Sequence, residues 1–450
     1  MTTPATIAAA PAHPASRWSA APTGIPLGGR DRFIDLIRVL AIAAVVLQHW
    51  AMPVMQFRDG QTLVSSALQT PGAQLVTWIS QIMPLFFFAG GAANVVSWRS
   101  ARRRTKTASS WLSVRLGRLS FPVLAVAAVW IPLPYLLEML GAPAGPVTEA
   151  TFWVARVLWF LPVYLMCVVC TPVAEKMAAR RPLLALGGLL AGAVIVEILR
   201  LAVSDSFGYA NFIFVWLLIH QLGIMYANGQ LGFLTPKRAA AVAAGAYATV
   251  AAMVTFGPYP VMMLALPGVG ASNQAPPTLC LLAQCVGLLA LALALRPALL
   301  ALAEKRLVDR LISAVSDRMM TVYIWHMTAL MVGAGICVIA LHINTPAPLS
   351  ITWWLTAPLW LGLLAALLYP LVRVFGRLES IRMPRIPDAV GPVRATVATL
   401  LIAGGLLGIM LAGFTPTATP LLLGPIPAAA AVAVGLAVLS RTPARKSVEA

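Results

Sequence analysis

Charged residues are scarce in this chain of 450 residues: they make up 10% of it, and only 14 of them are aspartate or glutamate. So few acids cannot form a carboxylate cage around a metal ion, and no two histidines have the spacing of metal ligands. No glycine-rich loop follows a strand pattern, so a phosphate-binding loop or a dinucleotide-binding fold is not expected either. The sequence therefore predicts no metal site and no permanently bound cofactor.

The chain also lacks a polar stretch long enough to form a soluble domain. Hydrophobic residues make up 60% of it and its mean hydropathy is +0.86, values outside the range of soluble globular proteins. Apolar runs of about 20 residues recur from end to end, separated by short loops, as in helical membrane proteins. We therefore predict an all-α fold, a polytopic transmembrane helical bundle with about ten core spans and two additional C-terminal spans.

The apolar runs that are long enough to cross a bilayer number about twelve. Their predicted ranges are 34–55, 74–98, 112–137, 154–173, 183–203, 209–227, 239–257, 277–301, 317–341, 351–372, 395–413 and 421–440. The first 29 residues are rich in alanine and proline and have no continuous apolar core, so we expect a disordered tail and not a cleavable signal peptide. The first span must then direct membrane insertion itself.

The basic residues indicate how the spans are oriented. All but four of the 32 lysines and arginines fall in alternate segments that begin with the N-terminal tail, the exceptions being Arg38, Arg58, Arg156 and Arg200. Cytoplasmic segments of membrane proteins carry such an excess, so we expect a multi-pass protein of the plasma membrane with both termini in the cytoplasm. Topology and attraction to membrane lipids account for most of the net charge of +18, so nucleic acid is not expected as a partner.

The stretch "DLIRVLAIAAVVLQHW", residues 35–50, carries ionisable residues in a pattern that is otherwise apolar. Arg38 and His49 are eleven residues apart, so on a helix their side chains lie within about 20° of one another, and Asp35 lies one turn earlier on nearly the same side. Eleven residues rise about 16 Å, which places Arg38 near the cytoplasmic boundary and His49 in the outer half of the bilayer. Such a stripe is expected to face the bundle interior or a water-filled cavity.

Two interpretations of the stripe are open. In the first, His49 is a general base, because imidazole titrates near working pH, and Arg38 binds an anionic part of a substrate or holds Asp35 by an ion pair. In the second, Arg38 reaches back to the inner surface and His49 is hydrogen-bonded between helices. Spacing alone does not decide between them.

The segment "RFIDLIRVLAIAAVVLQH" resembles the first helix of acyltransferase family 3, the multi-spanning enzymes that acylate envelope glycans, lipids and secondary metabolites. The resemblance includes Arg32, Asp35, Arg38 and His49. It recurs in order over about residues 30–375 in "PLFFFAGGAANVVSW", "VRLGRLSFP", "VLWFLPVYL" and "TVYIWHMTAL". It implies an acyltransferase that uses acyl-CoA, with acetyl-CoA as one candidate donor, and it favours a catalytic interpretation of His49, Arg38 and Asp35.

The resemblance also implies a division of the chain. A cytoplasmic tail at 1–29 precedes an acyltransferase-like transmembrane domain at 30–376; a cytoplasmic loop with the two additional spans follows at 377–440, and a cytoplasmic tail at 441–450. The last two spans exceed the ten common in the family, so we expect them to be peripheral. The sequence departs from the family in "FFFAGGAA", which lacks a small polar residue, and at Tyr164, where some branches carry an acid.

Further candidate residues bind substrate in this hypothesis. Arginines and a lysine crowd residues 99–118, and guanidinium groups bind phosphate bidentately, so the phosphates of acyl-CoA are expected here. Arg115 and Arg118 are the better candidates, whereas the "RRR" cluster fits a lipid headgroup anchor. The late segment contributes His326, Trp325 and Tyr323. His326 is interpreted either as a buried hydrogen-bonding residue or as a group that orients the acceptor or the acyl carbonyl.

Other polar or reactive residues have structural interpretations. The five cysteines, the Cys167 and Cys170 pair included, lie in or beside apolar spans and are interpreted as packed core residues. His220 is interpreted as a helix-packing residue. The uncharged loop 257–277 is interpreted as a connector, with a lid over the acceptor site as the alternative.

The sequence therefore predicts an O-acyltransferase that moves an acyl group from cytoplasmic acyl-CoA to a hydroxyl of an extracytoplasmic or membrane-associated carbohydrate, lipid or small molecule. His49 removes the hydroxyl proton, and the transfer is either direct or passes through an acyl-histidine. The alternative is a twelve-span proton-coupled transporter in which His49 and Asp35 relay protons.

Overall fold

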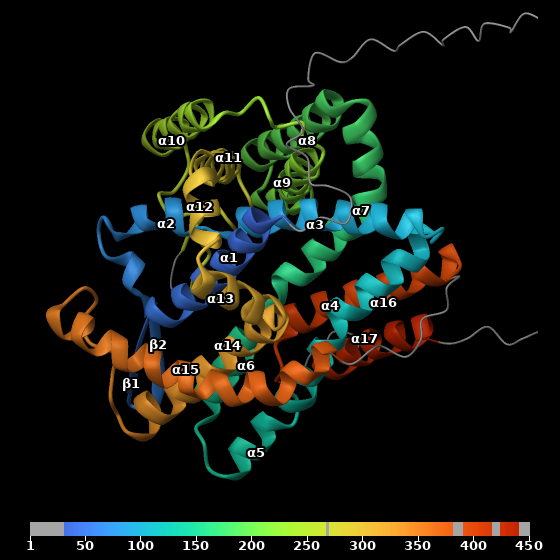
Figure 1. Ribbon diagram of the computed structural model, residues 1–450. Helices are drawn as coiled ribbons and strands as arrows, with labels where there is room; N and C mark the ends of the chain where they lie inside the picture. The colour runs from blue at the N-terminus through green and yellow to red at the C-terminus, as the bar shows by residue number, and fades with distance from the viewer. Residues whose placement is uncertain (1–30, 267–269, 381–389, 416–423, 441–450) are drawn as a thin grey trace, which may run out of the picture.

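The computed structural model describes residues 31–266, 270–380, 390–415 and 424–440 (Figure 1). Within these ranges ten helices are long and apolar enough to cross a membrane, and a bent pair of helices makes an eleventh if it is counted as one span. A shorter apolar helix lies near the C-terminus. The predicted all-α transmembrane bundle is therefore confirmed, whereas the N- and C-terminal tails lie outside the described residues.

In the described residues, twelve apolar helices overlap the predicted spans. They are α1 (Arg32–Ala51), α3 (Met83–Arg103), α4 (Ala108–Trp130), α7 (Phe160–Arg180), α8 (Pro182–Ala202), α9 (Asn211–Ala227), α10 (Pro236–Phe256), α11 (Leu279–Ala294), α14 (Met319–Ala334), α15 (Ile351–Ser380), α16 (Pro392–Ala412) and α17 (Pro425–Ser440). Shorter helices lie between them: α2 (Thr77–Ser80), α5 (Leu133–Met139), α6 (Ala144–Arg156), α12 (Arg296–Ala303) and α13 (Arg306–Ser316). Single turns complete the set: η1 (Ala67–Gln69), η2 (Ala73–Val76), η3 (Val157–Trp159), η4 (Asp205–Ala210) and the π-helical η5 (Gly335–Ala340).

The first span ends earlier than predicted, because a β-hairpin follows it. Strands β1 (Pro53–Arg58) and β2 (Gln61–Ser66) pair antiparallel, and the turn between them has positive φ at Asp59 (51°) and Gly60 (75°). Asp-Gly favours such two-residue turns, and Pro53 cannot continue the helix, which explains why the prediction of a helix to residue 55 is wrong. The bundle thus has a hairpin end, where α1 stops, and a start end, where α1 begins.

The span predicted at 277–301 is broken. Helices α11 and α12 meet at an angle of 60°, with Pro297 in the first turn of α12. Proline lacks the N–H that a continuous helix needs and its ring clashes with the preceding turn, so the chain bends here. The amphipathic α13 follows at the start end, where Asp309 lies 3.7 Å from Arg32.

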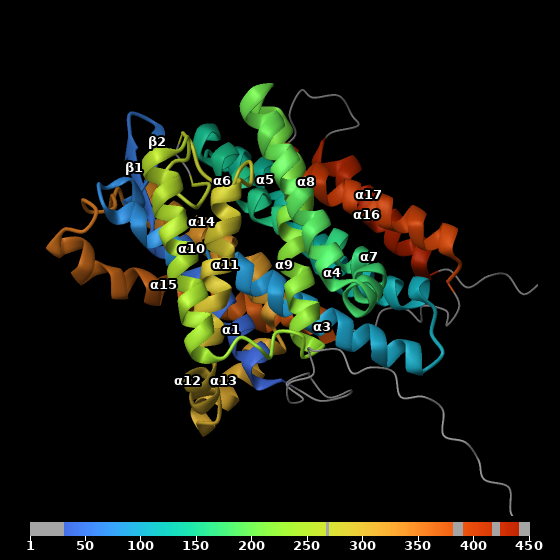
Figure 2. The same ribbon diagram turned by 90° about the horizontal axis from the view of Figure 1, so that it is seen from above.

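Helices α1, α3, α9 and α14 form the interior of the bundle, and α1 lies near its centre in both views (Figures 1 and 2). The crossing of α3 and α9 depends on two glycines: a Cβ atom at Gly91 would lie 2.1 Å from the carbonyl oxygen of His220, and one at Gly223 would lie 1.9 Å from that of Phe88. Small residues allow such backbone contact between membrane helices. His220 is fully buried here and contacts Asn94 at 3.3 Å, in agreement with its predicted packing role.

The last two spans lie at one edge of the bundle, as expected for additional spans, but they are closely packed against it. Helix α17 packs on α16 and α4, and α16 also contacts α6, η3 and α7. Ile402, Leu406 and Ile409 on α16 are fully buried, and a Cβ at Gly405 would lie 2.5 Å from the carbonyl oxygen of Ala428. An apolar stripe and a small residue thus fix this pair against the bundle (Figure 2).

Candidate active site

Two histidines from α1 and α14 meet in the interior of the bundle. His49 lies near the end of α1, and its Nδ1 is 2.7 Å from Nε2 of His326. The two rings are stacked, with 5.0 Å between their centroids and 10° between their planes. His326 is fully buried, whereas His49 is partly exposed. Two predicted site residues that are 277 positions apart in sequence are therefore in direct contact.

The hydrogen bonds of this pair determine where the protons lie. Nδ1 of His326 is 2.5 Å from the carbonyl oxygen of Tyr323, and a carbonyl oxygen only accepts, so this nitrogen carries a proton. In a neutral ring the Nε2 of His326 is then an acceptor, and Nδ1 of His49 donates to it. Nε2 of His49 is left without a proton and has no partner among the described residues. Its lone pair is therefore available to a substrate.

Neighbouring side chains hold the two rings in place. The indole N–H of Trp50 donates to the carbonyl oxygen of His326 at 3.0 Å, and that of Trp360 donates to the carbonyl oxygen of Trp50 at 2.8 Å. The hydroxyl of Tyr323 donates to the carbonyl oxygen of Val157 at 2.5 Å. These bonds join α1, α14, α15 and η3, so the pair is fixed by the packing of four elements.

A cavity of about 930 Å³ lies on the hairpin side of His49. Its walls come from α1, the hairpin, α6, η3, α7, η4, α9, the loop before α11, α14, η5 and α16, and they are mostly apolar or aromatic. The polar side chains in them are Gln48, His49, Thr62, Ser65, Ser66, Glu149, Arg156, Tyr209, Ser272 and Gln274. Across the described ranges no group of three or more histidines, cysteines, aspartates or glutamates is arranged to hold a metal ion.

Two charged residues of α6 line this cavity, although neither was predicted as a site residue. Glu149 and Arg156 are seven residues apart and both lie in its wall, with Trp153 between them. The indole N–H of Trp153 donates to the carboxylate of Glu149 at 3.4 Å. An acid seven residues before a base, on one face of a helix in a chain with few acids, was the available signal.

Arg38 lies on the same face of α1 as His49, as predicted. Its guanidinium donates to the sulfur of Met319 at 3.8 Å, and both residues thus contact α14. The guanidinium of Arg38 turns toward α14, and no ion pair between Arg38 and Asp35 occurs among the described residues. Asp35 is partly buried in the first turn of α1.

Arg38, Arg115 and Arg118 form a cationic cluster. The guanidinium of Arg115 lies close enough to Tyr164, Arg118 and Arg38 to interact with them electrostatically. Arg118 is exposed and the other two arginines are partly exposed. None of the three forms an ion pair with any described residue. Three unpaired cations close together are suited to binding an anion.

The neighbouring cations of the same segment are partly neutralised. Arg99 forms an ion pair with Glu175 at 2.7 Å, and Arg102 approaches the same carboxylate at 3.4 Å. Glu175 is nearly buried, so this pairing fastens α3 to α7. Arg115 and Arg118 thus remain the better candidates of the segment for an anionic substrate.

Of the predicted site residues, only His49 lines the cavity. The cationic cluster does not, so the described cavity is not a continuous passage from Arg38 to His49. Trp325 is 1% exposed and stacks on Phe375 of α15, with 4.0 Å between ring centroids. The contacts of Trp325 and Tyr323 are therefore packing contacts within the bundle.

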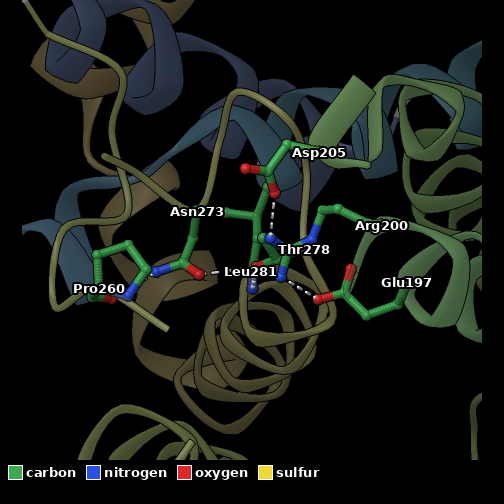
Figure 3. A network of polar contacts seen from close by, with 7 residues as sticks. All are labelled: Glu197, Arg200, Asp205, Pro260, Asn273, Thr278 and Leu281. Carbon is green, nitrogen blue, oxygen red and sulfur yellow. Dashed lines mark hydrogen bonds and ion pairs between the residues drawn. The ribbon is translucent and has the colours of Figure 1, made fainter. Parts of the chain in front are cut away.

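An ion-pair network between α8 and η4 lies beside the loop that precedes α11 (Figure 3). Arg200 binds Glu197 at 2.8 Å and Asp205 at 3.1 Å, and its guanidinium lies 5.9 Å from the ring centroid of Tyr259. Burial raises the pKa of the Tyr259 hydroxyl, and the nearby negative charge of Glu197 raises it further. Arg200 is one of the four basic residues that fall outside the predicted cytoplasmic segments. Its contacts give it a structural role at the hairpin end of the bundle.

The loop itself is cross-linked by side-chain hydrogen bonds. Asn273 donates to the carbonyl oxygen of Pro260 at 2.6 Å and accepts from Thr278 at 2.7 Å (Figure 3). Gln274 accepts from the backbone N–H of Ala265 at 2.9 Å. These bonds agree with a fixed connector that forms one wall of the cavity, although residues 267–269 lie outside the described ranges.

The chain that carries the paired histidines can be compared with known protein families. A family model described as an acyltransferase domain matches residues 31–336. The chain belongs to the acyltransferase 3 family. No curated protein and no solved structure matches it.

This acyltransferase is therefore a multi-pass membrane enzyme that transfers acyl groups, and the family match decides against the alternative of a transporter. Both histidines of the pair and all three arginines of the cationic cluster lie within the matched residues. Helices α15, α16 and α17 lie beyond them, yet α16 supplies Leu407, Met410 and Leu411 to the cavity wall.

Proposed function

We propose that this acyltransferase moves an acyl group from cytoplasmic acyl-CoA to a hydroxyl group of an acceptor in the cavity, with His49 as the general base. The observation that carries the proposal is the pairing of His49 with His326 at the wall of the cavity. A lone histidine between helices needs no unpaired nitrogen, whereas His49 keeps one directed away from its partner. The tautomer of the pair leaves the lone pair of that nitrogen free to accept a proton.

The reaction balances without a further group. Nε2 of His49 takes the proton of the acceptor hydroxyl while the oxygen forms a bond to the thioester carbonyl carbon. The carbon–sulfur bond then breaks, and the thiolate of coenzyme A takes the proton back from His49, which gives an ester and a free thiol. General-base catalysis contributes about two to four orders of magnitude, so positioning of both substrates must supply most of the remainder.

His326 is a positioning residue in this mechanism. While His49 is protonated, its Nδ1 still donates to Nε2 of His326, and the carbonyl oxygen of Tyr323 keeps His326 in the tautomer that accepts. The positive charge that appears on His49 is thus met by a polarised acceptor. The ring keeps its orientation through the cycle.

The cationic cluster is proposed to bind the phosphates of acyl-CoA. Arg38 lies eleven residues, or about 16 Å, before His49 along α1, a distance that an extended pantetheine arm spans. The described cavity does not reach Arg38, so entry of the arm requires the helices between the cluster and the cavity to part. We place the start end of the bundle in the cytoplasm, with both termini there, and the enzyme in the plasma membrane. The lysines and arginines of the alternating segments support this orientation.

The test uses the purified enzyme in lipid vesicles with radiolabelled acetyl-CoA and with lipids and glycans extracted from the cells that make the protein. The wild-type enzyme is expected to label an acceptor, and His49→Ala is expected to lose this activity while it keeps binding acetyl-CoA. Label transfer by folded His49→Ala at the wild-type rate would refute the proposal. Labelling that requires a proton gradient and not acyl-CoA would refute it as well.

A further inference from the structure

The cavity is bounded on one side by residues that also face the surface of the bundle. These are Tyr209 in η4 and Ile213 at the start of α9, which are 57% and 46% exposed. Near the end of α16 they are Leu407 and Leu411, which are 44% and 57% exposed. Wall residues of a closed cavity would be buried, so these four mark an opening between α9 and α16, and the exposed Ala265 and Ala275 mark a second opening at the loop before α11.

Helix α7 forms the floor between these two helices. Both α9 and α16 pack on it, and its Val163 and Met166 line the cavity. Val169 and Val173 follow Met166 at three and seven residues, on the same face, and are 39% and 66% exposed. The apolar floor of the cavity therefore continues without a break onto the outer surface of the bundle.

The opening lies at the level of the membrane where the chemistry is proposed. His49 follows Arg32 by 17 residues, a rise of about 25 Å across a hydrocarbon core of about 30 Å. Leu411 is the second-last residue of α16, and Tyr209 lies just before α9, so both belong to the same end as His49. Headgroups of the leaflet at this end would thus be level with the unpaired nitrogen of His49.

We propose that the acceptor is a membrane-resident amphiphilic alcohol that enters sideways from this leaflet, between α9 and α16. This inference rests on the function proposed above and names the substrate class. The hydroxyl reaches His49, the polar head lies beside Glu149 and Arg156, and the hydrocarbon chain leaves over Met166 into the lipid. None of the four residues that mark the opening is charged, so the opening suits a hydrocarbon chain and not a free sugar.

The experiment uses a phosphatidylcholine that carries a diazirine on its acyl chain, mixed into the vesicles of the reconstituted enzyme. After illumination, mass spectrometry locates the label. We expect label on Met166 of α7 and on Met327 and Met331 of α14, which all line the cavity, as well as on lipid-facing residues such as Leu355 of α15. Label on the lipid-facing residues alone would overturn the proposal.

Two substitutions test the route. Ile213→Trp and Leu411→Trp fill the opening and are expected to abolish the label on Met327 and Met331, while Leu359→Trp, on the exposed face of α15, leaves it unchanged. Persistent label on Met331 in both filling variants would overturn the route. A water-soluble diazirine that labels Met331 where the lipid probe does not would show entry from water instead.

Acyl transfer is measured in the same vesicles as a separate readout. If the enzyme transfers acyl groups but no label appears inside the cavity, the proposed function stands and the sideways route is refuted. If label appears inside the cavity but no donor supports acyl transfer, the proposed function is refuted. The entering lipid can then no longer be assigned as an acceptor.

Discussion

The two ends of α1 carry ionisable side chains that lie in opposite environments. His49, near the hairpin end, has one nitrogen bound to a fully buried partner whose own proton is fixed by a backbone carbonyl. Arg38, toward the start end, has a weak contact with the sulfur of Met319, and it lies near two more arginines.

This difference in hydrogen bonding and charge indicates which chemical role each end is suited to. A hydrogen-bond chain that leaves one lone pair open is arranged to move a proton, because every other donor and acceptor of the pair is already used. A cationic cluster without an ion pair among the described residues is arranged to receive an anion, because its electrostatic cost falls when one binds. Catalysis and donor binding are therefore expected to respond to separate substitutions.

The largest effect is expected at the hairpin end. His49→Ala should lower the turnover number by about 10²- to 10⁴-fold, the contribution of a positioned general base. The measurement is steady-state transfer of labelled acyl groups in vesicles. The matched control is His342→Ala, an exposed histidine outside the pair, which should keep the wild-type rate.

The partner histidine should matter less and in a recognisable way. His326→Ala removes the acceptor for His49 Nδ1, and turnover should fall by about tenfold to a hundredfold, as for loss of a charge-assisted hydrogen bond, while the KM for acyl-CoA stays unchanged. His326→Gln, whose side-chain oxygen is an acceptor, should restore part of the rate. Equal loss in both variants would mean that His326 only packs.

The start end should show the reverse pattern. Arg38→Gln should raise the KM for acyl-CoA by about tenfold, because one charged contact to phosphate is lost from a partly exposed site, while turnover at saturation changes little. Arg103→Gln, an exposed arginine of the neighbouring segment, is the matched control and should leave KM near the wild-type value. A similar rise in both would point to general attraction and not to a binding site.

The smallest effect is expected at Trp325. Its indole N–H has no partner and its ring stacks on Phe375, so Trp325→Phe keeps the stacking and removes no hydrogen bond. Turnover and KM should both stay within about twofold of wild type, since Trp325 packs within the bundle and does not line the cavity. A tenfold loss of either would return Trp325 to the list of substrate-binding residues.

The fold was largely predictable because long apolar runs have few alternatives in a membrane. The hairpin was also readable, since Asp59 and Gly60 lie between two short strand-like segments, but the apolar run of α1 masked it. The bend between α11 and α12 had a signal in Pro297. These features depend on neighbours in sequence.

The site was predictable only in part. The common face of Arg38 and His49 follows from helix geometry, but the contact of His49 with His326 depends on how α1 crosses α14, which no local pattern specifies. The same holds for α16, whose Met410 lines the cavity although its sequence differs little from that of other apolar helices. Contacts between distant helices are set by packing, and one sequence does not reveal them.

The most direct test compares His49→Ala and Arg38→Gln in one experiment. The dissociation constant of acyl-CoA and the rate of a single turnover are measured for both folded variants in the same vesicles. We predict that His49→Ala binds acyl-CoA as the wild type does and fails to transfer, whereas Arg38→Gln binds weakly and transfers at nearly the wild-type rate once saturated. Normal single-turnover transfer by His49→Ala would contradict the assignment of its imidazole as the base.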